Sequence, residues 1–159
     1  MGCDIHTWVE RKTQNGWELL DVKPEIFGYS RHYGLFGWLA NVRNYSAIPP
    51  AFAGRGLPED LSEGFRNYWG GADGQIEFDY HNAGFVLASE LLQFDYKSVM
   101  EDRRVTAKLP SGITSVGCTA PPGEGQKMTY AVFLGEWVLA EIIRLCALGE
   151  VRLIFGFDS

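Results

Sequence analysis

The sequence has few of the features that assign a function directly. Its 159 residues include three cysteines and no C-x-x-C pair, which argues against a disulfide framework and a structural zinc site. No H-E-x-x-H, G-x-S-x-G or G-x-x-x-x-G-K-[ST] motif is present. The zinc-protease, serine-hydrolase and P-loop classes therefore receive no support from local motifs.

Positive charge is also scarce. Fourteen Lys and Arg residues stand against 20 Asp and Glu residues, which gives a net charge of -6 with no basic patch. We therefore expect no extended nucleic-acid surface, although a small phosphate ligand needs only two or three local donors. The most apolar stretch, 130–149, carries Glu136, Glu141 and Arg144, so no membrane span is expected. Polar residues among the first six argue against a signal peptide, and the cytosol of the host cell is the expected location.

Aromatic residues are abundant, at 14% of the chain. Such a surplus fits either a dense aromatic core or a pocket for a flat ligand. The length favours one domain over 1–159. The pattern of elements favours an α+β fold, with a mainly antiparallel sheet packed on one face against three to four helices.

The expected elements follow from hydrophobic periodicity and turn signals. The N-terminal hairpin and the C-terminal strand are expected to build the sheet, and 110–126 reads as a mobile Gly/Pro-rich loop. The predicted elements are a hairpin over 2–22, helices over 33–43, within 59–71, over 85–96 and over 129–148, and strands around 76–80, within 103–109 and over 150–159.

The opening "MGCDIHTWVE" places three reactive side chains close together. In a strand, Asp4, His6 and Trp8 share one face, and Cys3 and Ile5 share the other. The Asp4 and His6 Cβ atoms would then be about 6.5–7 Å apart. That spacing suits two ligands of one metal, or a carboxylate and an imidazole that converge on a substrate; a solvated hairpin edge is the alternative. Trp8 on this face favours a pocket or a second packed layer.

Two further residues could complete this site. His81, in the polar segment "FDYHNAG", is a third catalytic candidate if its loop folds over Asp4 and His6. A His/Asp/His set could bind a divalent cation or act without metal, so the cofactor is left open. Asp158 would join the site if the final strand pairs beside the first.

Several residues are candidates for binding a ligand. An Arg guanidinium donates in a bidentate fork that matches phosphate. Arg31 and Arg43 flank the first predicted helix together with Asn44, and Arg55 lies between glycines, where backbone approaches a ligand closely. Arg43 at a helix end could instead only satisfy the helix dipole, and Arg55 could equally be an exposed loop residue. Tyr33 joins Trp8 as an aromatic contact candidate.

The chain resembles small proteins encoded by phages and prophages. The resemblance is carried by "MGCDIH", by "R-x-Y-x-LF-x-x-LA-x-VRN" over 31–44, by "RGLP-x-D-x-S" over 55–62 and by the terminal "VRLIFGFD". The segment around "DYHNAGFVLAS" departs from the family pattern, which leaves the match of His81 open. Small phage proteins of this sort include counter-defence factors that cleave or sequester nucleotide immune signals such as cyclic dinucleotides and ADP-ribose derivatives.

Three functional hypotheses follow. The first is a hydrolase of a phosphodiester-type bond in a small signalling nucleotide, with His6 as acid, base or metal ligand and Asp4 as its partner. The second is a non-catalytic sponge with the same pocket, which would not need an Asp/His pair. The third is a phage protein that binds a host protein. Sites for symmetric ligands often form between subunits, so a homodimer is also a prediction.

Overall fold

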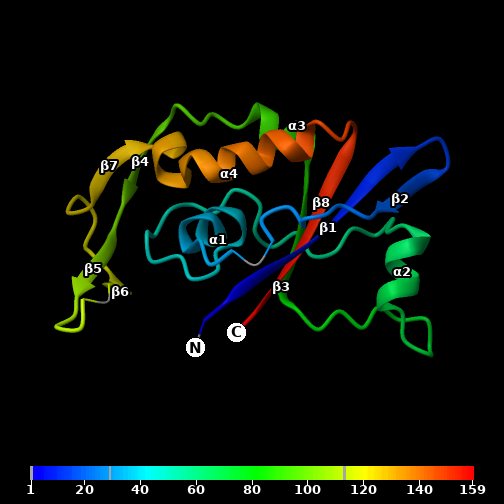
Figure 1. Ribbon diagram of the computed structural model, residues 1–159, viewed down its shortest axis with the longest axis horizontal. Coiled ribbons are helices and arrows are strands. Elements are labelled where there is room, and N and C mark those ends of the chain that lie inside the picture. Colours follow the sequence, from blue (N-terminus) through cyan, green and yellow to red (C-terminus); the bar gives the residue numbers. More distant parts are fainter. Residues whose placement is uncertain (1, 29, 113) are drawn as a thin grey trace. The chain divides into compact units, whose positions relative to one another are not determined.

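The computed structural model describes residues 2–28, 30–112 and 114–159. Its helices and antiparallel sheets confirm the α+β class (Figure 1). The elements are β1 (Asp4–Thr13), β2 (Gly16–Leu20), α1 (Tyr33–Ala40), α2 (Glu63–Trp69), β3 (His81–Leu87), α3 (Ala88–Gln93), β4 (Val99–Asp102), β5 (Arg104–Lys108), β6 (Thr114–Thr119), β7 (Gln126–Thr129), α4 (Tyr130–Cys146) and β8 (Val151–Asp158).

The backbone clusters into two compact units. Unit 1 comprises Met1–Arg31, Gly54–Phe94 and Ala140–Ser159, and unit 2 comprises His32–Ala53 and Asp95–Leu139. Unit 1 contains the four-stranded sheet, and unit 2 contains α1 and the two-stranded sheets β4-β7 and β5-β6. A single domain over 1–159 stays a prediction.

The sheet of unit 1 is built from the two ends of the chain. Its order is β2-β1-β8-β3, and every neighbouring pair is antiparallel. The predicted hairpin is confirmed: Thr13 pairs with Gly16 across a two-residue turn, and Gly16 has a positive φ of 118° that suits glycine. The predicted terminal strand is confirmed as well, and β8 runs beside β1 (Figure 1).

The sheet carries apolar side chains on both faces. On one face Trp8, from β1, and Ile154, from β8, pack with Phe65 of α2. This is the second packed layer that Trp8 predicted. On the other face Ile5, from β1, and Phe157, from β8, are fully buried. A strand pair with two covered faces explains why seven of the eight β8 residues are buried.

The segment 81–93 corrects two predictions. A strand was expected around 76–80 and a helix over 85–96, but β3 spans His81–Leu87 and only Ala88–Gln93 is helical. Gly84 lets β3 approach β8 closely, because a Cβ at Gly84 would lie 2.6 Å from the Phe155 ring. The helix begins after Leu87, whose N–H donates to the Glu90 carboxylate at 2.9 Å. Pairing with β8 therefore overrides the local helical pattern.

The other helices follow the sequence more closely. Helix α1 is confirmed but ends at Ala40, where Asn41 takes a left-handed φ of 61°. Helix α2 is confirmed within 59–71. The long C-terminal helix is confirmed over Tyr130–Cys146, but Gly135, at φ 82° and ψ 163°, interrupts it.

The region 110–126 is more regular than predicted. Strand β6 occupies Thr114–Thr119 and pairs antiparallel with β5, which confirms the strand within 103–109. Residue 113 of the predicted loop lies outside the described residues. Across the described ranges, no helix is long and apolar enough to cross a membrane.

Candidate functional site

Strand pairing brings Asp4, His6 and Asp158 to one face of the sheet. Asp4 lies directly opposite Asp158, and His6 lies opposite Gly156, so these positions share a face. The His6 Nε2 and the Asp158 Oδ2 are 2.9 Å apart, and the Asp4 backbone N–H donates to the Asp158 Oδ1 at 3.0 Å. The Asp158 carboxylate is thus held at both oxygens. This fulfils the condition on which Asp158 was predicted to join the site.

Arg31 closes the site on the other side of Asp4. Its Nε donates to Asp4 Oδ1 at 2.7 Å and its second guanidinium nitrogen donates to Asp4 Oδ2 at 3.1 Å. The guanidinium lies against Gly2, where a Cβ would be 2.6 Å from the Arg31 Cζ. The small residue before Cys3 therefore makes room for this bidentate pair.

An aromatic ring holds the imidazole in position. The rings of His6 and Tyr80 stack at a centroid distance of 4.4 Å and an angle of 25°. Opposite His6, a Cβ on Gly156 would lie 2.5 Å from the Tyr80 Cβ and 2.7 Å from the Phe78 ring. Only glycine at 156 leaves space for Tyr80 to lie beside His6. Sequence reasoning missed Tyr80, although it stands next to His81 in the same polar segment.

The site is accessible in part. The exposed fractions are 17% for the His6 side chain and 51% for Asp158, while Asp4 in its ion pair is 26% exposed. The imidazole is therefore shielded by its neighbours and still within reach of solvent. This degree of exposure suits a group that exchanges protons with a ligand.

Both carboxylates are held in the ionised form. The hydrogen bond from Arg31 lowers the pKa of Asp4, partly opposed by desolvation. The hydrogen bond from His6 lowers the pKa of Asp158, again against a smaller effect of desolvation. Asp4 and Asp158 therefore act as acceptors at neutral pH, and the imidazole is the group in this cluster suited to move a proton.

The imidazole and Asp158 form an orienting pair. A carboxylate that accepts from one ring nitrogen fixes the tautomer and the orientation of the imidazole. The cluster contains two negative carboxylates and one positive guanidinium. A proton on His6 would therefore make the net charge of the cluster zero. An anionic ligand is consequently better accommodated beside the protonated imidazole.

His81 lies on the opposite face of the sheet. It pairs with Phe157, which also pairs with Ile5, and its ring lies 6.1 Å from the Phe157 ring. Asp158 is the next residue on β8 and faces the other way. His81 Nε2 instead approaches the Ser159 Oγ at 3.3 Å. The structure does not bring His81 to the face that holds His6.

Arg55 is engaged within unit 1. Its guanidinium donates to both carboxylate oxygens of Glu90, at 2.7 and 2.8 Å, and lies 5.7 Å from the centre of the Phe85 ring. The hydrogen bonds that Arg55 donates to Glu90 raise the pKa of Arg55. This arrangement ties the segment around Arg55 to α3.

The remaining predicted residues belong to unit 2. Asn44 braces its own loop, because its amide donates to the Ile48 carbonyl at 2.8 Å and to the Asn41 side chain at 2.9 Å. Arg43 has a left-handed φ of 47°, and the Tyr33 ring lies 5.6 Å from that of Phe36. These contacts lie within unit 2.

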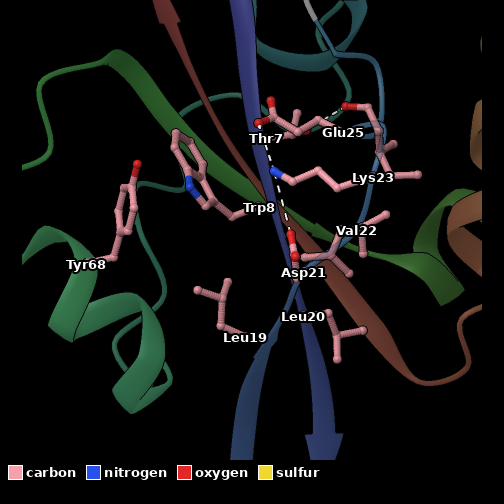
Figure 2. Close-up of a pocket in the computed structure, with 11 residues that line it drawn as sticks. Thr7, Trp8, Leu19, Leu20, Asp21, Val22, Lys23, Glu25 and Tyr68 are labelled. Atoms are coloured by element: carbon pink, nitrogen blue, oxygen red, sulfur yellow. Dashed lines mark hydrogen bonds and ion pairs between the residues drawn. The ribbon is translucent and has the colours of Figure 1, made fainter.

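Trp8 has two environments. Its ring packs edge-on against Trp69 and Phe78, at centroid distances of 5.6 and 5.2 Å. It also lines a cavity of about 260 Å³, beside Tyr68, as Figure 2 shows. Trp8 is therefore both part of the packed layer and part of a cavity wall.

A buried ion network at the far end of the same strands was not predicted. Arg152 donates to Glu10 at 2.7 Å and to Asp60 at 2.6 Å, and its guanidinium lies 4.0 Å from the centre of the Trp17 ring. Glu10 also accepts from the backbone N–H of Ser62, the residue whose side chain caps α2. One arginine within the apolar "VRLIF" run was the available signal for a buried acidic partner.

No metal site emerges from the side chains that the structure describes: these contain no group of three or more His, Cys, Asp or Glu residues arranged to hold a metal ion. Comparison of the chain with family models, with curated proteins and with solved structures found no match.

Proposed function

We propose that the protein is a hydrolase that cleaves a phosphodiester-type bond in a small signalling nucleotide, such as a cyclic dinucleotide or an ADP-ribose derivative. The observation that carries the proposal is the 2.9 Å contact between His6 Nε2 and Asp158 at a partly exposed strand end. This pair has the donor, the orienting carboxylate and the solvent access that proton transfer requires.

The charge count favours His6 as a general acid. Protonated His6, oriented by its contact with Asp158, delivers a ring proton to the leaving oxygen. Water attacks phosphorus, the phosphorus–oxygen ester bond breaks, and the leaving oxygen takes the imidazole proton while the attacking water releases one proton to solvent. His6 regains its proton from solvent for the next turnover. Asp158 is a positioning residue in this scheme, since it acts through His6.

Arg31 contributes charge at the same place. Asp4 holds the guanidinium by two hydrogen bonds, so its orientation is set before a ligand arrives. A pre-oriented guanidinium stabilises charge that develops on phosphoryl oxygens. Arg43, Tyr33 and Asn44 stay proposed ligand contacts, but the catalytic scheme requires only residues of unit 1.

The biological setting is part of the same proposal. The resemblance to phage-encoded proteins supports a counter-defence role in the host cytosol, acting on an immune signal, and a homodimer would suit a symmetric ligand. A non-catalytic sponge is the second candidate, because the Asp4–Arg31 pair is pre-organised to bind an anion without chemistry. Binding of a host protein is the third.

One incubation distinguishes these functions. The protein is mixed with a panel of cyclic dinucleotides and ADP-ribose isomers, with and without EDTA, and the nucleotides are analysed by HPLC before and after heat denaturation. New products support the hydrolase, and the EDTA arm reports whether a divalent cation takes part. Intact ligand released only by heating supports the sponge. An unchanged panel before and after heating contradicts both nucleotide functions.

A further inference from the structure

The cavity of Figure 2 opens where the sheet loses a strand. Strand β2 ends at Leu20, opposite Val9, whereas β1 continues to Asp4. Continued by two residues, the register would place residue 22 opposite Thr7. The chain turns away instead, and Asp21–Glu25 forms the wall that faces Trp8 and Tyr68 across the cavity (Figure 2). The floor of the cavity is thus the edge of β1 at Thr7–Val9.

The backbone of Thr7 points its hydrogen-bonding groups into this gap. The Lys12 N–H donates to the Glu150 carbonyl, and the Asp4 N–H donates to Asp158, so even-numbered residues of β1 face β8. The direction alternates along a strand, and Thr7 therefore faces the side that β2 vacates. Within the described part of the chain, neither its N–H nor its C=O has a hydrogen-bond partner. The Thr7 hydroxyl is bonded separately, to the Ile26 carbonyl.

The walls define what would pair with this edge. Tyr68 is 69% exposed and stands beside Trp8, which provides an aromatic surface. The opposite rim carries Asp21 and Glu25 with only Lys23 between them, at 3.6 and 4.0 Å from their carboxylates. Two carboxylates against one ammonium leave a negative rim, which is complementary to a cationic side chain.

We propose that this cleft binds an extended peptide segment with a basic residue by β-strand addition. One peptide residue pairs its N–H and C=O with those of Thr7, in the position that residue 22 would hold if β2 continued. The neighbouring peptide side chains then point to the Trp8 and Tyr68 face, because side chains alternate along a strand. A basic side chain meets the Asp21–Glu25 rim. This site is independent of the His6–Asp158 pair and of the proposed hydrolase.

The test uses the full chain and a defined probe. The probe is an N-acetylated, C-amidated pentapeptide of sequence lysine-tyrosine-valine-tyrosine-lysine, titrated to millimolar concentration while backbone amide signals are followed by NMR. The matched control replaces the central valine by its hydroxy-acid analogue, which removes one N–H donor without adding bulk. The protein variants are Tyr68→Ala and, as an exposed aromatic outside the cavity, Trp137→Ala.

The expected result is a saturable shift of the Thr7 amide signal, with binding of the ester analogue weakened about tenfold. Tyr68→Ala should weaken binding several-fold, and Trp137→Ala should leave it unchanged. Failure of the Thr7 signal to move overturns the proposal, and so does equal binding of the two peptides. A Thr7 shift that depends on protein concentration without peptide would assign the edge to a second copy of the chain instead.

Discussion

Strands β1 and β8 carry two ionic clusters that differ in burial. At one end Glu10 pairs with Arg152 directly across the strands, and these two side chains are 0% and 3% exposed. At the other end His6 pairs with Asp158 on the same face, with 17% and 51% exposure. The first cluster is enclosed by Trp17 and α2, and the second lies where the strands end.

This difference separates structural from functional charge. Breaking a buried ion pair strongly destabilises the fold, because removal of one partner leaves the other charged in a medium that solvates it poorly. An exposed pair contributes little to stability, and its groups can exchange partners with a ligand. The Glu10–Arg152 end is therefore expected to hold the fold, and the His6–Asp158 end to be available for binding and proton transfer.

The largest expected effect is at the buried end. Glu10→Ala should lower the free energy of unfolding by about 3–5 kcal/mol, because Arg152 stays buried and the Ser62 N–H loses its acceptor. Denaturant unfolding measures this change. The matched control is Glu18→Ala, whose carboxylate pairs with Arg11 in the same hairpin at 45% exposure and should cost less than about 1 kcal/mol. Equal losses of unfolding free energy in both variants would show that burial does not distinguish the two ion pairs.

The next effect concerns the position opposite His6. Gly156→Ala should destabilise the fold by about 1–3 kcal/mol, because the new Cβ overlaps Tyr80 and Phe78. It should also displace the Tyr80 ring from the imidazole, which the NMR signals of the two rings report. Gly117→Ala is the control, since a Cβ there meets nothing within 4 Å. If Gly156→Ala left both the free energy of unfolding and the ring signals unchanged, the proposed overlap with Tyr80 and Phe78 would be contradicted.

A smaller effect is expected at the exposed end. Asp158→Asn should change the free energy of unfolding by less than about 1 kcal/mol, since the carboxylate lies at the surface. The same denaturant assay applies. A loss near that of Glu10→Ala would show that the His6–Asp158 pair holds the fold and would weaken its assignment as a functional site.

The smallest effect is a dependence of stability on pH. The pKa values of Asp4 and Asp158 are lowered below the ordinary 3.8 in the folded chain, by Arg31 and His6 respectively. A carboxyl with a lowered folded pKa stabilises the fold above its unfolded pKa and loses that contribution as the pH falls through its folded pKa. The stability gap between the wild type and Asp158→Asn should therefore be constant above about pH 5. It should close below 3.8. A gap that widens on acidification would reverse the assigned direction.

The sequence predicted much of this site because strand alternation is a local rule. It grouped Asp4, His6 and Trp8 on one face and separated them from Cys3 and Ile5. The partnership with Asp158 depended on pairing of the terminal strands, which was stated as a condition and is observed in the β1–β8 register. Arg31 was predicted as a phosphate donor, but its bond to Asp4 was not foreseen.

What escaped prediction depends on contacts distant in sequence. Glu10 and Arg152 are 142 positions apart, and nothing in either local pattern identifies the other. The helix expected over 85–96 begins later because β3 pairs with β8, and this tertiary pairing decided the conformation of Phe85–Leu87. The face of His81 likewise depends on the register of β3 against β8 and not on its place in a polar segment.

The most direct test of this assignment compares the two histidines on the strands that flank β8. Cleavage of the nucleotide panel is measured for the wild type, His6→Ala and His81→Ala, with circular dichroism to confirm that each variant is folded. We predict that His6→Ala loses about 10²–10⁴-fold in rate, as expected for loss of a general acid. His81→Ala, changed on the opposite face, should retain the wild-type rate. Full activity of folded His6→Ala, or loss of activity only in His81→Ala, would contradict the claim that His6 and Asp158 form the functional site.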